Sequence, residues 1–127
     1  MALMEKQAAY QMPALQLAFI GDTVCDLLVR TELMFSPCSI REMHARASGT
    51  VNARAQAAQL DRILHLLDGE ETDIVRRARN AHPGHSIPQA ASREEYMKAT
   101  AFEALLGYLY LSGQMRRAQR LFELSRV

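Results

Sequence analysis

Residues 13–33, PALQLAFIGDTVCDLLVRTEL, form the stretch of this sequence that decides the fold. Pro13 suits the first turn of a helix, and Gly21 is the one further helix breaker before the stretch ends. On a helical wheel, one face collects apolar side chains that we expect to meet a core: Leu17, Ile20, Val24, Leu27 and Leu28. The pattern predicts one long helix packed against its neighbours.

The opposite side of this predicted helix carries Asp22 and Asp26 among the apolar side chains of Leu15, Phe19 and Val29. A helix that is apolar on both sides is usually buried on both sides. A carboxylate in such a place costs free energy unless it is paired, protonated or bound to a cation. The pattern alone leaves two interpretations of Asp22 open: a cation ligand, and a surface acid or ion pair with an arginine.

The rest of the chain also predicts helices, and no segment alternates as a strand would. Residues 39–42 (SIRE) and 92–95 (SREE) have the form of capping boxes, which satisfy backbone donors at a helix start. We expect helices over about residues 13–33, 39–48, 51–67, 72–80, 92–111 and 114–125, with Gly49 as a break, Thr72 as an N-cap and a loop at 81–91. The expected fold class is all-α, as one domain over residues 1–127.

Composition excludes several classes of protein. Hydrophobic residues make up 49% of the 127 residues and charged residues 23%, values of a globular domain rather than a disordered chain. No apolar run reaches the roughly 18–20 residues of a membrane span and no signal pattern opens the chain, so we expect a cytoplasmic protein without a membrane partner. Cys25 and Cys38 lack the spacing of a zinc site and are expected to be free thiols.

The predicted helix at residues 92–111 repeats the anomaly of the first. Its core stripe consists of Phe102, Leu105, Leu106 and Leu109. Glu103 projects away from that stripe, in a row with Gly107, and a glycine inside a helix costs about 1 kcal/mol unless another element must approach closely. Two helices, each with one acid among apolar or small residues, suggest a site for a hard cation such as Mg²⁺. The alternative for Glu103 is an interhelical salt bridge, with Arg30 or Arg54 as the partner.

Several of these segments resemble the ribonuclease III family. Residues 17–24 (LAFIGDTV) resemble the signature helix of that family, and residues 100–110 (TAFEALLGYLY) resemble its second acidic motif. Residues 43–44 (MH), 77–81 (RARNA) and 98–103 (KATAFE) are similar to the compact branch called Mini-ribonuclease III. We expect no separate double-stranded-RNA-binding domain in this chain, whose last residue is Val127, and this expectation also fits that branch.

The resemblance implies a Mg²⁺-dependent endoribonuclease that hydrolyses phosphodiester bonds in double-stranded RNA, with Asp22 and Glu103 as catalytic residues and metal ligands. Full-length family members carry further acids where this chain has Ala18 and Thr100, so we expect one firmly held metal per site. A second ion would depend on water, RNA phosphate or Asp26. The branch is associated with maturing the ends of large-subunit ribosomal RNA precursors, which is the substrate that the resemblance implies.

Contacts with RNA have to come from the surface of this domain. The net charge of +1 lends little support to nucleic-acid binding, but the arginines are unevenly spread and a basic face can exist. The candidates are His44, Arg46, Arg54, Arg77, Arg79, Asn80 and Lys98, with His82 and His85 in the loop. The alternative for each of these residues is a solvated side chain without a role in RNA binding. For Asn80 the alternative is a helix C-cap. For Lys98 the alternative is a salt bridge to Glu94 or Glu95, and we favour that salt bridge over a contact with RNA.

The resemblance also implies a homodimer in which the signature helices of two subunits meet, and the doubly apolar face of residues 13–33 independently suits such an interface. One alternative function is a catalytically inactive module that binds double-stranded RNA. Another is a structural helical protein whose acids are ion-paired. The four histidines and two cysteines form no pattern that supports a histidine- or cysteine-based nuclease.

Overall fold

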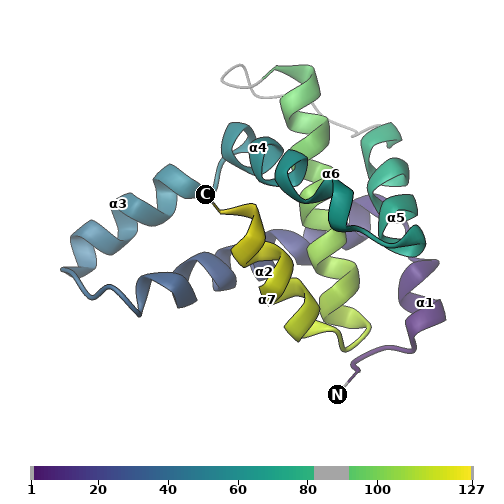
Figure 1. Cartoon of the computed structure of the whole chain (residues 1–127), viewed down its shortest axis with the longest axis horizontal. Coiled ribbons are helices and arrows are strands. Elements are labelled where there is room, and N and C mark those ends of the chain that lie inside the picture. The colour runs from purple at the N-terminus through teal and green to yellow at the C-terminus, as the bar shows by residue number, and fades with distance from the viewer. Residues whose placement is uncertain (1, 82–91, 127) are drawn as a thin grey trace.

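The computed structural model of the chain describes residues 2–81 and 92–126, and these residues form only helices and their connections (Figure 1). The elements are α1 (Lys6–Tyr10), α2 (Ala14–Leu33), α3 (Ile40–Thr50), α4 (Ala53–Ile63), the 3-10 helix η1 (Leu64–Leu66), α5 (Gly69–Asn80), α6 (Arg93–Leu111) and α7 (Met115–Ser125). The predicted all-α fold is confirmed. Of the predicted loop at 81–91, residues 82–91 lie outside the described residues, and these include His82 and His85.

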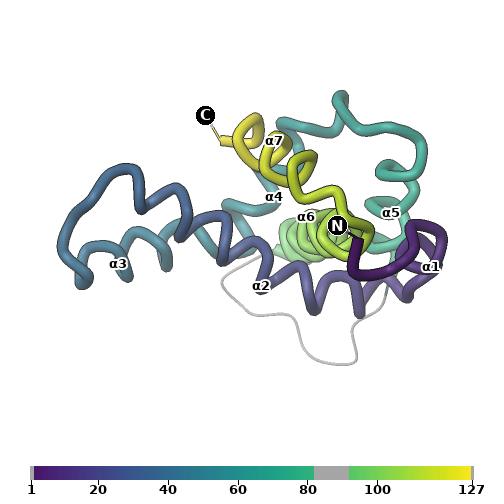
Figure 2. The backbone as a smooth tube through the Cα atoms, turned by 90° about the horizontal axis from the view of Figure 1, so that it is seen from below, coloured from purple at the N-terminus to yellow at the C-terminus, as the bar shows by residue number. Residues whose placement is uncertain are grey.

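Helix α6 is the centre of the molecule. In Figure 2 it is seen end-on, with α2 passing on one side, α4 and α7 lying across from α2, and α5 and α1 at its flank. The predicted core stripe of Phe102, Leu105, Leu106 and Leu109 is fully buried. Tyr108 and Ala104 are buried as well, because α6 has neighbours on nearly every side. Glu103 therefore lies on a helix that has little contact with water.

Helix α2 crosses α6 and then leaves the body of the molecule, and α3 folds back along the part that projects (Figure 1). Leu17, Val24 and Leu28 are buried, as predicted. Leu27 is 54% exposed, so its predicted place in the core is wrong, whereas Val29 on the opposite side is buried, as expected of a helix that is apolar on both sides. A straight wheel assumes the same neighbour along a whole helix, whereas α2 exchanges α6 for α3 towards its C-terminus.

The helix caps confirm one predicted helix start, whereas other helices start at residues that differ from the prediction. Ser92 and Glu95 form the predicted reciprocal capping box at α6. At α3, Ser39 accepts a bond from the Glu42 amide, but the Glu42 carboxylate pairs with Arg46 instead of returning to the cap. The prediction is therefore half right at this second site.

Two helix boundaries differ from the prediction. Asp68 and Glu71 form a capping box that starts α5 at Gly69, so Thr72 is not the N-cap. The break between α3 and α4 falls at Asn52, whose side chain caps α4, and Gly49 lies inside α3. In both cases a polar side chain that accepts a backbone hydrogen bond decided the boundary, rather than the nearby glycine.

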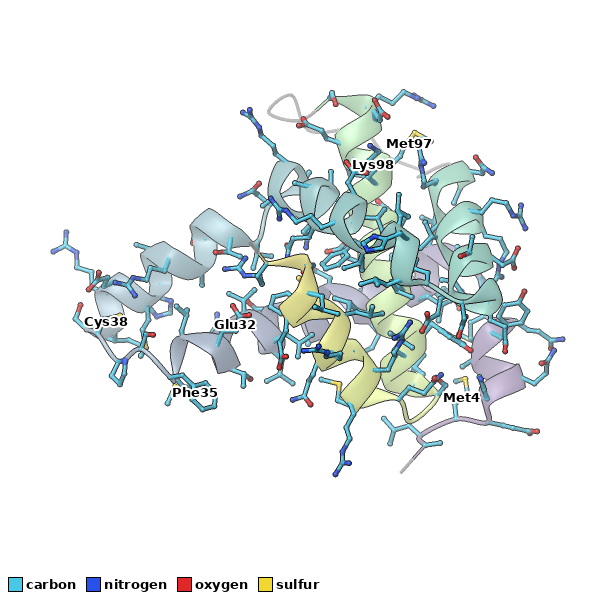
Figure 3. All side chains as sticks on the ribbon, viewed as in Figure 1. Met4, Glu32, Phe35, Cys38, Met97 and Lys98 are labelled. Carbon is cyan, nitrogen blue, oxygen red and sulfur yellow. The ribbon has the colours of Figure 1, made fainter. Side chains whose placement is uncertain are left out.

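Both cysteines are free, as predicted. No helix within the described ranges is long and apolar enough to cross a membrane. Figure 3 shows Phe35 and Cys38 at the far end of the α2–α3 projection, where the Phe35 side chain is exposed.

Candidate active site

Two glycines bring α2 and α6 into backbone contact. A Cβ atom on Gly21 would lie 1.7 Å from the carbonyl oxygen of Glu103, and one on Gly107 would lie 2.1 Å from the carbonyl oxygen of Leu17. Both distances are far below any tolerable contact, so each position accepts only glycine at this helix separation. The predicted close approach at Gly107 is confirmed. Because Asp22 follows Gly21 and Gly21 touches the backbone of Glu103, the crossing also brings the two acids together.

The carboxyl groups of Asp22 and Glu103 interact across this crossing. Burial, together with the hydrogen bond and the charge of Asp22, raises the pKa of Glu103 to about 8. Asp22 itself is exposed, whereas Glu103 is largely buried beneath it. A carboxyl with that pKa stays protonated at neutral pH when no cation lies nearby, because burial disfavours its charged form and the adjacent Asp22 carboxylate repels it.

A third side chain reaches the pair from α4. Gln56 is 4% exposed, and its Nε2 lies 3.4 Å from Oε2 of Glu103 and 3.4 Å from Sγ of Cys25. The amide donates to the Glu103 carboxylate and lowers the pKa of that group, against the larger effect of burial. Gln56 was not among the residues predicted for the site. The available signal was its i, i+4, i+7 spacing with the buried Leu60 and Ile63, which put a polar side chain on an apolar face.

The ion-pair alternatives for the two acids are not realised in the described part of the chain. Arg30 pairs with Asp26 at 3.1 Å, and the Nε of Arg54 lies 4.0 Å from Glu95. Neither arginine bonds to Glu103, and no basic side chain within residues 2–81 and 92–126 pairs with Asp22. Asp26, the candidate ligand for a second metal ion, is thus engaged by Arg30.

The pair has the donor chemistry of a Mg²⁺ site. Mg²⁺ is usually held by one or two carboxylates and keeps several of its waters. Asp22 and Glu103 supply such a set, and burial together with the adjacent Asp22 raises the pKa of Glu103. Across the described residues, no group of three or more His, Cys, Asp or Glu side chains is arranged to hold a metal. The residues therefore fit a sparse site with two protein ligands.

Cys25 lies against this site without the properties of a nucleophile. Burial is the main cause that raises the pKa of its thiol to about 11, and the nearby acids raise it further. A thiol with that pKa is protonated at neutral pH, and only the thiolate is strongly nucleophilic. The structure thus agrees with setting aside a cysteine-based reaction.

The candidate RNA-contacting residues do not gather into one cluster. Arg77 donates to the carbonyl oxygens of Tyr10 and Met12, pairs with Asp73 and stacks over the Tyr10 ring, 5.1 Å from its centroid. These contacts attach α1 to α5 and give Arg77 a role in the fold. Arg79 and Asn80 line a hollow between α5 and α6. Asn80 is the last residue of α5 and Ala81 is the C-cap, so the capping alternative for Asn80 is wrong.

Lys98, labelled in Figure 3, lies between two acids. Its Nζ is 3.1 Å from Asp61 and 3.5 Å from Glu94, and the hydrogen bond to Asp61 is the main cause that raises its pKa. The favoured salt bridge to Glu94 is confirmed, and Asp61 is a partner that the helical spacing did not reveal. Arg54, by contrast, has a side chain that is 85% exposed.

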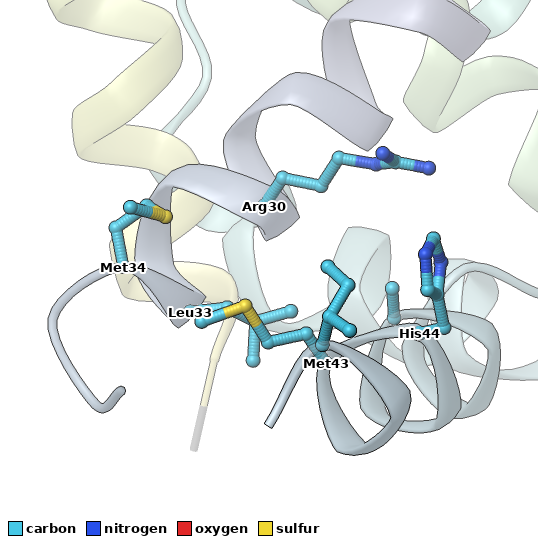
Figure 4. Close-up of a pocket in the computed structure, with 7 residues that line it drawn as sticks. Arg30, Leu33, Met34, Met43 and His44 are labelled. Atoms are coloured by element: carbon cyan, nitrogen blue, oxygen red, sulfur yellow. The ribbon is translucent and has the colours of Figure 1, made fainter. Parts of the chain in front are cut away.

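The other two candidates lie on α3. Arg46 forms an ion pair with Glu42 at 2.8 Å on the exposed side of that helix. His44 lines a small apolar pocket between α2 and α3, together with Arg30, Leu33, Met34 and Met43 (Figure 4). Both residues are exposed and lie on the projecting part of the molecule.

Comparison with known proteins identifies the family of this chain and a solved structure of similar fold. Residues 15–114 match the Ribonuclease III domain. The Mini-ribonuclease 3 of Thermoanaerobacter sp. (strain X514) is 41% identical over 97% of this chain and 87% of its own, and that of Symbiobacterium thermophilum is 41% identical over 88% and 86%. A crystal structure of a protein from Fusobacterium nucleatum matches with a TM-score of 0.81 and 28% identity, covering 89% of this chain and 90% of that one.

The chain therefore belongs to the ribonuclease III family of endoribonucleases. Its relatives put it in the Mini-ribonuclease 3 branch of that family, as the resemblance at residues 43–44, 77–81 and 98–103 predicted. Both acids of the pair lie inside the matched region.

Proposed function

We propose that this chain is a Mg²⁺-dependent endoribonuclease that cuts double-stranded RNA at the Asp22–Glu103 pair. The observation that carries the proposal is the contact between these two carboxyls at the glycine crossing of α2 and α6, which no basic side chain among the described residues neutralises. Two carboxylates on two rigid helices hold their oxygens in fixed positions. Carboxylates fixed in this way bind a cation better than a carboxylate on a mobile surface side chain does.

Each acid has its own task in this proposal. Asp22, exposed at the surface of α2, is the anchoring ligand and orients the attacking water. Glu103, buried below it, is the second ligand and must lose its proton before it can bind a cation. When bound, Mg²⁺ supplies Lewis-acid chemistry: it lowers the pKa of a water and offsets the charge of the scissile phosphate.

The proposed enzyme is a homodimer whose subunits meet through α2. Phe19 is 83% exposed and Leu15, one turn earlier, is also exposed, so α2 presents apolar side chains to water beside Asp22. A twofold axis at this face would set the two sites against the two strands of one duplex. Such a pair of sites cuts both strands and leaves a short staggered end.

RNA recognition in this proposal is by shape, through phosphates and 2′-hydroxyls. The exposed candidates that remain available for phosphate are His44, Arg46, Arg54 and Asn80, and Arg79 is partly exposed. The proposed substrate is a base-paired end of a large-subunit ribosomal RNA precursor, met in the cytoplasm. Sequencing the ribosomal RNA ends of a strain that lacks the protein tests this part of the proposal.

The decisive experiment compares the wild type with Glu103→Gln on a base-paired RNA, with and without Mg²⁺. Gln preserves the shape of Glu103 but is a poor ligand for Mg²⁺, so we expect cleavage to fall by on the order of 10³-fold while RNA binding stays nearly unchanged. Duplex binding without cleavage by the wild type at any Mg²⁺ concentration would instead identify an inactive RNA-binding module. Near-normal cleavage by folded Glu103→Gln would refute the assigned role of Glu103.

A further inference from the structure

Gln56 is the one side chain of α4 that hydrogen-bonds to the acid pair among the described residues. Its Nε2 lies within bonding distance of Glu103 on α6 and of Cys25 on α2, and the residue is almost fully buried. Placing an amide in such a position costs free energy unless the amide finds partners. The contacts of Gln56 join the three helices that surround the acid pair.

The chemistry of the two acceptors is unequal. A thiol sulfur is a weak hydrogen-bond acceptor, whereas a carboxylate oxygen is a strong one, and bonds to charged groups are roughly twice as strong as neutral ones. Glu103 therefore gains more from the amide than Cys25 does. The bond also fixes one carboxylate oxygen on the α4 side, which leaves the other oxygen for the side of Asp22.

A second buried glutamine on the same helix supplies an internal comparison. Gln59 is 1% exposed, and its Nε2 bonds to Oγ of Ser125 on α7, at 3.0 Å. It has the same residue type, the same helix and the same burial as Gln56, but its partner is a neutral hydroxyl. Gln59 thus represents what a glutamine of α4 does when its role is packing alone.

We propose that Gln56 is a positioning residue that holds the Glu103 carboxylate in the orientation required to bind a divalent cation. The inference rests on the proposed function, since it assigns the support of the same metal site. Side chains that orient a metal ligand typically contribute 10- to 100-fold to metal affinity. We expect an effect on the order of 10-fold here, because Gln56 bonds to one oxygen of one ligand.

The test measures cation affinity in the absence of RNA. Mn²⁺ suits the same oxygen ligands as Mg²⁺, and its binding is followed by calorimetry and by the paramagnetic signal of the free ion. Gln56→Met keeps the length of the side chain and removes the donor, and Gln59→Met is the matched control. We expect Gln56→Met to weaken Mn²⁺ binding on the order of 10-fold and Gln59→Met to leave it unchanged, although both lower Tm.

A double-mutant cycle with Glu103→Gln separates positioning from general loosening of the fold. If Gln56 acts through Glu103, then Gln56→Met has no further effect on Mn²⁺ affinity once Glu103 is Gln. Equal weakening in both backgrounds, or equal weakening by the two glutamine variants, would overturn the inference. If Gln56→Met does not fold, Gln56→Leu takes its place. Cys25→Ala is then measured beside it. Because Cys25→Ala removes only the sulfur acceptor of Gln56, we expect it to retain wild-type affinity for Mn²⁺.

The two proposals fail in different ways. Absence of Mn²⁺ binding and of cleavage in the wild type would count against the proposed function as a whole. Wild-type binding and cleavage, with undiminished Mn²⁺ affinity in Gln56→Met, would leave that function intact and remove only the role of Gln56.

Discussion

The Glu103 side chain is a titratable group whose proton affinity the fold has changed. Burial and the neighbouring Asp22 raise its pKa to about 8, while a glutamate in an unfolded chain titrates near 4.3. Because the folded pKa is the higher one, the folded state holds its proton more tightly. The stabilising contribution is therefore complete below about pH 4.3 and is lost as the pH rises through about 8.

Because the pKa of Glu103 is raised on folding, the stability of the metal-free protein should depend on pH. In EDTA, the Tm of the wild type falls between pH 5 and pH 9 relative to that of Glu103→Gln, which carries no titrating group at this position. The accumulated difference in free energy of unfolding is expected to reach a few kcal/mol at most, since partial exposure screens the effect. Thermal melts across this pH range measure it.

The control variant is Glu94→Gln, which removes an exposed acid from the same helix. Its pH profile should follow that of the wild type. A Glu103→Gln variant that retains the full wild-type pH dependence would show that Glu103 titrates as an ordinary surface acid. Addition of Mg²⁺ should diminish the dependence in the wild type, because the cation competes with the proton for the same oxygens.

At the scale of helices, the glycines at the α2–α6 crossing matter more than any single apolar contact. In Gly107→Ala the new Cβ meets the backbone oxygen of Leu17 at 2.1 Å, and neither backbone can move aside without separating the helices. We expect a loss of at least about 2–3 kcal/mol of stability and a larger loss of cleavage, because the separation also pulls Glu103 from Asp22. Chemical denaturation and cleavage assays measure the two effects.

Gly49→Ala is the matched control at this scale. Gly49 also lies inside a helix, α3, and a Cβ added there meets nothing within 4 Å. Ala has the higher helix propensity, so this variant should gain up to about 1 kcal/mol of stability and cleave as the wild type does. Equal effects of the two alanine substitutions would contradict the close contact at the crossing.

The sequence predicted the crossing more fully than it predicted the helix ends. Gly107, in an otherwise strong helix, indicated the close approach of another element. Helical spacing predicted that Asp22, next to Gly21, and Glu103, in the row of Gly107, lie off the core stripes of their helices. The boundaries at Asn52 and Asp68 were missed because a glycine nearby offered an equally local explanation. Gln56 was missed because its meaning depends on a partner 47 positions away in sequence, which no periodicity contains.

At the scale of the whole molecule, α2 presents apolar side chains that the chain does not cover by itself. Phe19 is 83% exposed although it lies one turn from the Asp22 site, and burial of such a ring against a partner removes a large apolar area from water. The sequence pattern predicted apolar side chains on both sides of this helix, and the buried side is explained by α6. The exposed side is explained if a second copy of the chain packs on it.

Phe19→Glu tests this directly. The substitution introduces two like charges at a twofold interface, one from each copy, so we expect the measured mass in solution to fall from that of a dimer to that of a monomer. The free energy of unfolding of a single subunit should change little, because the Phe19 ring is largely exposed and has few contacts within its own chain. Cleavage of both strands in one encounter should be lost, since a single site reaches only one strand. Phe19→Leu, which keeps the surface apolar, should remain dimeric and cut both strands; a Phe19→Glu protein that stays dimeric would move the interface away from this face of α2.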